Sequence, residues 1–230
     1  MNGRALSLPI PEVISRSDVR YRDLGLNERL LAARSRQVLP DALCHNDPMF
    51  HEGQCWLGQC DSAQTHLTKQ DVGRGDIFLF FGLFRCPESG ERHHRIFGYL
   101  KVADFGSPEA ASSSPHWGRP RLQHPHLTGI FPANNCIWFG PGRSDAPAVP
   151  GLRLTAPDAE GRASRWLVPS WLRDCGLSYH NDSKRWGKVV DPTGLLPLRC
   201  VGRGQEFVCD IGDRMDARKW VEARITEIDL

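Results

Sequence analysis

The stretch GRGDIFLFFGLFR, at residues 73–85, is the strongest indication of fold in this chain. Its run of Ile, Leu and Phe has the length and the side chains of a strand that is buried on both faces. A second apolar run, RIFGYLKVADF at residues 95–105, follows the charged connection CPESGERHH. The pattern therefore predicts a β-hairpin in which Ile77–Phe84 pairs with Ile96–Val102.

The segments around this hairpin predict shorter strands, with helices toward the ends of the chain. NCIWFG, LPLRCV and GQEFVCDI are typical of strands, and DSAQTHLTKQDV of a helix capped by Asp61 or Ser62. Apolar spacing predicts helices over residues 21–35 and 216–225, whereas residues 37–53 predict a loop. The order indicates an α+β fold: a central, mostly antiparallel or mixed β-sheet with peripheral helices and long loops.

Composition limits the class of protein. The 230 residues suffice for a sizeable core, and we expect a single domain over residues 1–230. Lys and Arg number 29 against 27 Asp and Glu, which does not predict a pronounced basic stripe for nucleic acid. No apolar run reaches the roughly 18 residues of a membrane span, and the first residues do not form a signal peptide. The eight cysteines are therefore expected to be reduced thiols in the cytoplasm.

Two short motifs bring imidazoles together with a carboxylate. CHNDP contains Cys44, His45 and Asp47, and HPH contains His124 and His126. His45 or Asp47 is a candidate general acid or base. The cysteine and the three histidines could instead form a metal-assisted hydrolytic site, but no CxxC or HExxH spacing supports one, so no metal ligand is assigned. A turn that carries hydrogen-bonded histidines is the remaining interpretation.

Three further polar stretches carry candidate residues. In LSYHNDSKRW, Tyr179 and His180 can stack on or hydrogen-bond a base. In SRW, the guanidinium of Arg165 can hold a phosphate or a carboxylate. Gln205 and Glu206 start a predicted strand and point to opposite faces, and an inward Glu206 would be a costly buried carboxylate unless paired. A surface glutamate on an edge strand explains Glu206 equally well.

Taken in order, these segments resemble a known family. The motifs extend from Gly3 to Val208 and are GRALSLPIP, CHNDP, GDIFLFFGLFR, RIFGYLKV, HPHLTG before NNCIWF, LRLTAP, SRWLVPSW, LSYHND and GRGQEFV. Each is weak alone, but the ordered combination is similar to the nucleotide-modification-associated domain family of the third type, found in bacteria and phages. Relatives typically begin with an extra strand and a polar, glycine-rich segment before SLPIP. The resemblance implies that this segment is missing here.

The resemblance implies a link to enzymes that modify bases in DNA, without an established reaction, and no cofactor is assigned. It also implies that the polar motif positions, among them Gln59, converge on one pocket. The positions carried over as catalytic are His45, Asp47, His180 and Glu206. Those carried over to hold phosphate, read a base edge or stack on a base are Arg85, His124, His126, Asn134, Asn135, Arg165, Tyr179 and Gln205.

The first hypothesis is accordingly an enzyme that binds a nucleotide or a DNA base, in which His45 or His180 moves protons with Glu206. The alternatives are a non-catalytic reader of modified bases, the metal-assisted hydrolase, and a structural domain with these polar residues scattered over its surface. The hairpin pattern also resembles barrels of the PUA and ASCH type, which bind modified or flipped bases. That looser analogy implies a barrel-like sheet.

Overall fold

The predicted hairpin is present in the computed structural model, which describes residues 3–25, 39–118, 120–189, 193–201 and 206–230. Strands β5 (Ile77–Arg85) and β6 (Arg92–Lys101) are neighbours in one sheet, which confirms the prediction. β6 begins before the predicted Ile96 because its first residues pair with a remote segment. The carbonyl of His94 accepts a hydrogen bond from the backbone N–H of Leu154 at 2.9 Å.

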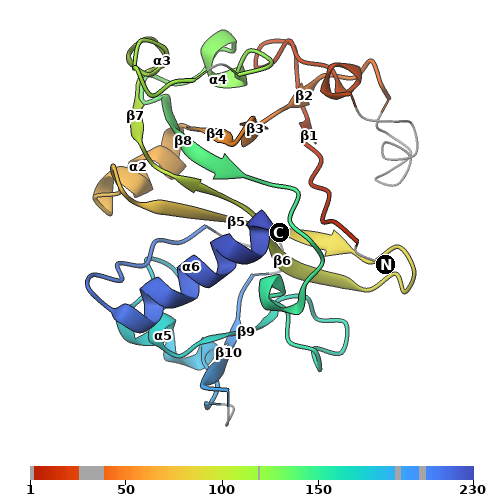
Figure 1. Cartoon of the computed structure of the whole chain (residues 1–230), viewed down its shortest axis with the longest axis vertical. Coiled ribbons are helices and arrows are strands. Elements are labelled where there is room, and N and C mark those ends of the chain that lie inside the picture. The colour runs from red at the N-terminus through yellow and green to blue at the C-terminus, as the bar shows by residue number, and fades with distance from the viewer. Residues whose placement is uncertain (1–2, 26–38, 119, 190–192, 202–205) are drawn as a thin grey trace. The chain divides into compact units, whose positions relative to one another are not determined.

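The described residues divide into two compact units (Figure 1). Unit 1 is drawn from residues 1–7, 79–99 and 144–230, and unit 2 from residues 8–78 and 100–143. Strands β5 and β6 contribute residues to both units. Each unit therefore combines segments that are distant in the sequence, and the single domain over residues 1–230 stays a prediction.

Unit 2 contains the strands that surround the candidate site. They are β1 (Ile10–Pro11), β2 (Cys44–His45), β3 (Met49–His51), β4 (Gln54–Gln59), β7 (Asp104–Gly106) and β8 (Cys136–Arg143). Its helices are η1 (Tyr21–Leu24), α2 (Asp61–Lys69), α3 (Pro108–Ser112) and α4 (Pro125–Thr128). β4 pairs with both β3 and β8, so that Gly58 lies opposite Ile137.

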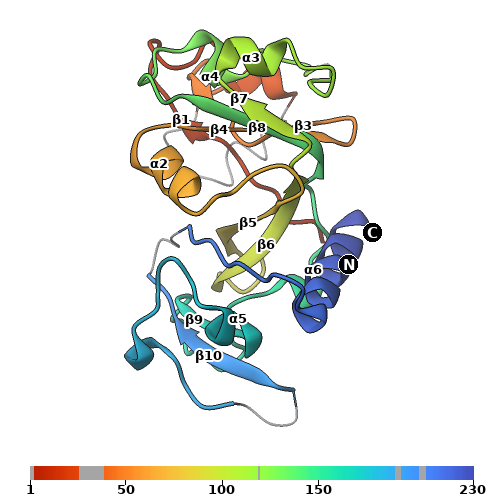
Figure 2. The ribbon, with the colours of Figure 1, turned by 90° about the vertical axis from the view of Figure 1, so that its left-hand side faces the viewer.

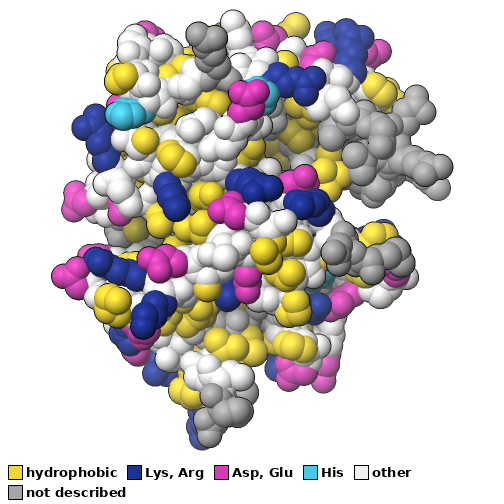
Figure 3. All heavy atoms as spheres, viewed as in Figure 1, with side chains coloured by type: hydrophobic (Ala, Val, Ile, Leu, Met, Phe, Trp, Pro, Cys, Tyr) yellow, Lys and Arg dark blue, Asp and Glu magenta, His cyan; other side chains and the backbone are white. Residues whose placement is uncertain are grey.

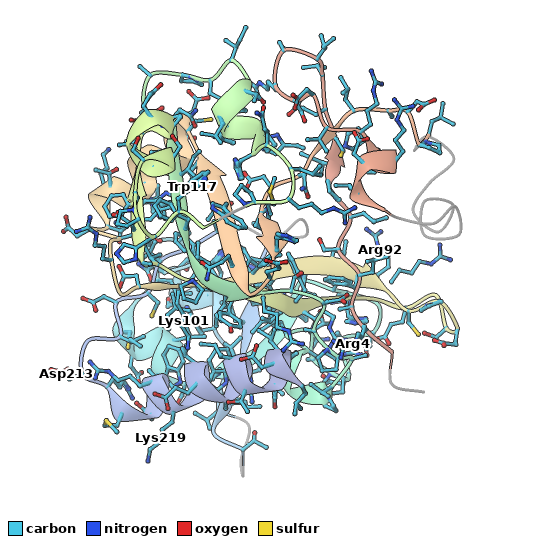
Figure 4. The ribbon with its side chains drawn as sticks, turned by 45° about the horizontal axis from the view of Figure 1, so that its top comes forward. Arg4, Arg92, Lys101, Trp117, Asp213 and Lys219 are labelled. Carbon is cyan, nitrogen blue, oxygen red and sulfur yellow. The ribbon has the colours of Figure 1, made fainter. Side chains whose placement is uncertain are left out.

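The core of unit 2 supports the β4–β8 pair. Trp56, Ile137 and Phe139 pack in one buried cluster, and Ala111 of α3 joins it. Trp117 lies in the loop after α3 and is labelled in Figure 4. Its carbonyl accepts a hydrogen bond of 2.8 Å from the indole N–H of Trp56. Fully buried aromatic side chains of this kind hold the register of β4, and hence the position of Gly58.

Unit 1 contains a two-stranded sheet, β9 (Arg165–Pro169) and β10 (Leu195–Arg199), with α5 (Trp171–Cys175) nearby (Figure 2). It also contains α6 (Met215–Asp229) and the short helices η2 (Pro150–Leu152) and η3 (Ser183–Arg185). The predicted closing helix is confirmed as α6. Its Trp220, Val221 and Ile225 side chains pack on the core, whereas Lys219 points away from the helix in Figure 4.

All the strand pairs with a defined register are antiparallel among the described residues. The largest sheet has the order β3–β4–β8–β6–β5, and β7 pairs with β8. Together with the short helices this confirms the predicted α+β fold. The barrel-like alternative is wrong, because the sheet of the described residues is open and β3 and β5 end its strand order.

Several local predictions need correction. The predicted loop over residues 37–53 contains β2 and β3. The distant strand β1 pairs with β2, and the adjacent strand β4 pairs with β3. The predicted strand over residues 204–211 is absent from its described part, residues 206–211. There Val208 exchanges hydrogen bonds with Ser178 instead of with a strand.

Of the two helices predicted before residue 73, the one at residues 61–72 is confirmed as α2, but both differ from the prediction in detail. In the predicted helix over residues 21–35, the described part is the short η1, which ends at Gly25 with a left-handed φ of 69°. Residues 26–38 lie outside the described residues. Helix α2 has Cys60 as its N-cap rather than Asp61 or Ser62. The side chain of the remote Asn134 accepts the backbone N–H of Asp61 at 2.9 Å, which replaces a local cap.

The surface carries charges of both signs. Figure 3 shows Lys and Arg side chains interspersed with Asp and Glu, in keeping with the near-balanced composition. Among the helices of the described residues, none combines the length and the apolar character needed to cross a bilayer.

Candidate functional site

A buried carboxylate, Asp47, faces three imidazoles in unit 2. Its side chain is only 6% exposed. Oδ2 lies 3.4 Å from Nε2 of His45 and 3.6 Å from Nε2 of His126, and Oδ1 lies 3.4 Å from Nε2 of His124. β2 ends at His45, and the other two histidines come from the start of α4. The motifs CHNDP and HPH therefore meet in space.

The HPH motif positions its two imidazoles through the start of α4. His124 is the N-cap, and its Nδ1 accepts a hydrogen bond of 3.2 Å from the backbone N–H of His126. Pro125 takes the first helical position, where its missing N–H is not needed and its fixed φ favours the helical conformation. The two rings consequently lie 5.6 Å apart, between centroids, beside the same carboxylate.

His126 is fixed on both sides of its ring. Its Nδ1 lies 2.5 Å from Oδ1 of Asn135, and the amide Nδ2 of Asn135 donates to the carbonyl of His126 at 2.9 Å. The ring of Phe131 stacks on the imidazole with a centroid separation of 3.9 Å and an interplanar angle of 15°. These contacts leave Nε2 of His126 directed at Asp47.

Gly58 of β4 is needed for this arrangement. A Cβ atom at position 58 would lie 2.2 Å from Cδ2 of His126, far inside van der Waals contact. The backbone N–H of Gly58 also approaches both oxygens of Asp47, at 3.0 and 3.2 Å. A glycine inside a strand often marks such a close approach.

The surroundings of Asp47 keep it ionised. Burial alone would raise its pKa, but the close approach of the imidazoles of His124, His45 and His126 outweighs burial, so the pKa lies well below its usual range. Burial lowers the pKa of His126, although Asp47 and Asn135 act in the opposite direction. At neutral pH the cluster therefore combines a carboxylate with a neutral His126.

His45 connects Asp47 to a second carboxylate. Its Nδ1 lies 3.3 Å from Oε2 of Glu12, which directly follows β1, and β1 pairs with β2 at Ile10 and His45. The side chain of His45 is 14% exposed, against 0% for His124 and 4% for His126. His45 is thus the imidazole of the cluster that an incoming molecule can reach most easily.

Other predicted residues of unit 2 lie outside this cluster. Asn134 binds the first residue of α2, since its Nδ2 also donates to the carbonyl of Asp61 at 2.8 Å. Gln59 is half-buried at the end of β4, opposite Cys136. Cys44 packs with Val19 and Tyr21, and burial raises the pKa of its thiol to about 12. A thiol that stays protonated is a poor metal ligand.

The remaining predicted residues belong to unit 1, except Gln205, which lies outside the described residues. His180 is buried, and its ring meets the ring of Phe207 edge to face at 6.1 Å. Tyr179, Glu206 and Arg85 are exposed. The convergence of all these positions on one pocket involves both units and stays a prediction.

Arg165 lines a cavity of about 380 Å³ in unit 1 that contains three more arginines. In the β9–β10 register Arg165 lies directly opposite Arg199. The guanidinium of Arg185 donates to the carbonyl of Arg199 at 3.0 Å, which holds it over β10. The other lining residues are Arg162, Ser164, Trp166, Pro197 and Leu198. Trp166 is only 2% exposed and packs in the core, so the arginines make the cavity a setting for an anionic ligand.

Sequence reasoning missed several residues that build these two sites. Glu12, Gly58 and Phe131 complete the histidine cluster, and Arg185 and Arg199 complete the arginine cavity. Gly58 carried a usable signal, because it interrupts the apolar strand sequence CWLGQC. The others had none, because a glutamate, a phenylalanine or an arginine has the same appearance in a sequence whether or not it forms a site.

Fold and site together define an α+β protein with open antiparallel sheets and a buried histidine–aspartate cluster. The chain belongs to the family described as nucleotide modification associated domain 3, whose model matches residues 1–210. The predicted family is thereby confirmed, and the family is associated with nucleotide modification. No curated protein and no solved structure gives a significant match.

Proposed function

We propose that this protein acts on a nucleotide, or on a base in DNA, in a modification reaction, and that the histidine–aspartate cluster of unit 2 is its reaction centre. One observation carries the proposal: Asp47, an ionised carboxylate that is 6% exposed, faces the ring nitrogens of three histidines. Groups with strongly shifted pKa values in a buried polar cluster are typical of reaction centres.

Proton transfer is the chemistry that such a cluster supports most directly. Nε2 of His45 lies 3.4 Å from Asp47, which fixes the orientation of an imidazole that can take a proton from a substrate. His45 is also the most exposed of the three histidines. His124 and His126 then act as positioning residues that hold Asp47 in place.

The arginine cavity of unit 1 is proposed separately to bind an anionic group such as a phosphate. Arg165 and Arg199 lie directly opposite each other in the β9–β10 pair, and like charges in that position destabilise a sheet. A bound phosphate removes this repulsion. Arg165 would thus keep the phosphate-binding role predicted for it.

The test is to incubate the purified protein with the common ribo- and deoxyribonucleotides and with single- and double-stranded DNA, both in buffer and in a small-molecule cell extract that supplies group donors. The nucleosides are then analysed by mass spectrometry. We expect a change in mass that His45→Gln and Asp47→Asn abolish and that His116→Gln, an exposed histidine of the same unit, leaves unchanged.

Binding without any change in mass would overturn the enzymatic proposal in favour of a modified-base reader. A change in mass that survives both His45→Gln and Asp47→Asn would place the reaction centre elsewhere. Absence of both binding and conversion would contradict the proposed substrate class.

A further inference from the structure

The tautomer of His126 is determined by its neighbour Asn135. The carbonyl of His126 can only accept a hydrogen bond, so the amide of Asn135 must direct its NH₂ group there, at 2.9 Å. Its oxygen is then the atom that lies 2.5 Å from Nδ1 of His126. An oxygen of this kind accepts, and Nδ1 therefore carries the hydrogen. In a neutral imidazole the other nitrogen, Nε2, is left with a lone pair.

That lone pair points at a carboxylate. Nε2 of His126 lies 3.6 Å from Oδ2 of Asp47, a carboxylate oxygen, which acts as an acceptor as well. His45 has a related problem, because its two nitrogens face two carboxylates, Glu12 and Asp47. A neutral His45 has one N–H for two acceptors. A cation placed between Nε2 of His45, Oδ2 of Asp47 and Nε2 of His126 would accept a lone pair from each of them.

His124 has the opposite tautomer. Its Nδ1 accepts the backbone N–H of His126, so its hydrogen is on Nε2, the atom that faces Oδ1 of Asp47 at 3.4 Å. The backbone N–H of Gly58 donates to Oδ1 at 3.0 Å and to Oδ2 at 3.2 Å, and it orients the carboxylate so that Oδ2 also faces His45 and His126. In metal centres, neighbouring groups typically form hydrogen bonds with the ligand atom that does not bind the metal, and so orient the ligand.

The distances fit a ligand set better than a hydrogen-bonded set. Separations of 3.4 and 3.6 Å from Oδ2 to the two Nε2 atoms exceed the usual 2.7–3.2 Å or so of an N–H···O bond. Ligand atoms at about 2.0–2.2 Å from a tetrahedral metal lie roughly 3.3–3.6 Å from one another. The candidate ligand atoms of His45, Asp47 and His126 all lie within 4.8 Å of one another.

We propose that Nε2 of His45, Oδ2 of Asp47 and Nε2 of His126 bind one divalent transition metal ion. His124, Glu12 and Asn135 orient these ligands through their other atoms. Burial of the cluster strengthens the attraction between the ion and the single carboxylate. The inference goes beyond the proposed function, since metal binding requires no nucleotide.

The ligand types restrict the ion and its use. Two imidazoles and one carboxylate suit zinc or ferrous iron better than magnesium or calcium, which prefer oxygen ligands. Three protein ligands leave at least one coordination position for water or substrate, as in catalytic rather than structural sites. With an ion bound, a metal-bound water replaces His45 as the base at this centre.

The test uses the full chain, stripped with a chelator and titrated with Co²⁺, without nucleotide. We expect visible absorption bands from about one tightly bound Co²⁺ per chain, which Zn²⁺ displaces, and no sulfur-to-cobalt charge-transfer band, because the ligands are nitrogen and oxygen. Element analysis of the protein before stripping distinguishes zinc from iron. No saturable Co²⁺ binding by the folded wild-type chain, or a strong sulfur band, overturns the proposal.

Variants assign the ligands. His45→Gln and His126→Gln are expected to weaken Co²⁺ binding by more than about 100-fold, and Asn135→Ala by about 10- to 100-fold. His116→Gln, an exposed histidine in the same unit, should bind as the wild type does. Wild-type affinity in folded His45→Gln or His126→Gln excludes the proposed ligands. Since the wild-type titration needs no variant, an unfolded variant does not prevent the test.

Discussion

The histidine cluster of unit 2 and the arginine cavity of unit 1 differ in how their charged groups are arranged. Around Asp47, groups of opposite or adjustable charge face one another inside the protein, and each has several partners. In the cavity, four arginines gather at the surface, and two of them lie opposite each other on paired strands. The first site is organised before any ligand arrives, whereas in the second the carboxylate of Glu160 lies 3.9 Å from both Arg162 and Arg165 and leaves positive charge for a ligand to balance.

This contrast leads to different expectations for mutations. Removal of a charge from the buried cluster leaves other buried groups without a partner, which costs stability. Removal of a charge from the surface cavity relieves repulsion and costs only binding. The predictions below test the contrast, starting with the largest expected effect.

Asp47→Asn is expected to cost the most, about 3–5 kcal/mol in the free energy of unfolding. The change keeps the shape of the side chain but removes the carboxylate charge that faces all three imidazoles. Urea denaturation of the chelator-treated protein measures the effect. As a control, Asp213→Asn removes a fully exposed carboxylate of unit 1 and should leave the stability unchanged. Equal effects of the two substitutions would mean that Asp47 is not the electrostatic centre of the cluster.

Gly58→Ala is expected to destabilise the fold by about 1–3 kcal/mol and to abolish Co²⁺ binding, because the new methyl group overlaps the His126 ring. The matched control is Gly73→Ala in the same unit, where the nearest atoms to a Cβ lie 3.9 Å away. Thermal unfolding and the cobalt titration together separate loss of fold from loss of site. Retained cobalt binding in Gly58→Ala would contradict the close approach of His126 to β4.

Acid should weaken the cluster of the metal-free protein in two stages. The folded-state pKa of His126 lies below its unfolded value of about 6.5, so unfolding takes up a proton as the pH falls through that value and stability decreases. The folded-state pKa of Asp47 is also lowered, so the carboxylate stabilises the fold above about pH 3.9 and this contribution disappears below it. Both effects act in the same direction.

The free energy of unfolding, measured between roughly pH 3 and 8, checks this expectation. The decrease near pH 4 should be smaller in Asp47→Asn, and the decrease near pH 6.5 smaller in His126→Gln. A flat profile in the wild type, or profiles that neither substitution changes, would show that these groups do not titrate as their surroundings indicate.

Arg165→Gln should have the smallest effect on the fold, within about 0.5 kcal/mol, but should weaken the binding of DNA. The slope of the logarithm of affinity against the logarithm of salt concentration is expected to fall by about 1, as for the loss of one phosphate contact. Arg218→Gln on α6 is the control, because it removes one arginine that does not line the cavity. The same loss of affinity in both variants would indicate a general charge effect.

Local patterns predicted those elements whose side chains determine their own structure. The apolar run of β5 and the stripe of α6 could be recognised because strand and helix periods place such residues in a core in almost any context. β2 and β3 could not, since each has only two or three residues and forms because a partner strand is present. The prediction of a strand was wrong for residues 206–211 for a related reason: Val208 forms its hydrogen bonds with Ser178 and not with a partner strand.

By itself, the sequence determined the α+β class, the central hairpin, the family and the chemical types in the CHNDP and HPH motifs. These depend on residue identity and on spacing along the chain. Only the tertiary structure decided that Asp47 joins the two motifs, that Gly58 admits His126 and that Asn135 fixes its tautomer. The physical reason is that hydrogen bonds and metal coordination depend on separations of a few ångströms between atoms, and the residues that carry these atoms lie far apart in the sequence. For the same reason, local spacing could not decide whether the HPH histidines belong to a turn or bind a metal. In the structure, His124 orients the backbone of His126, and His126 is a proposed ligand.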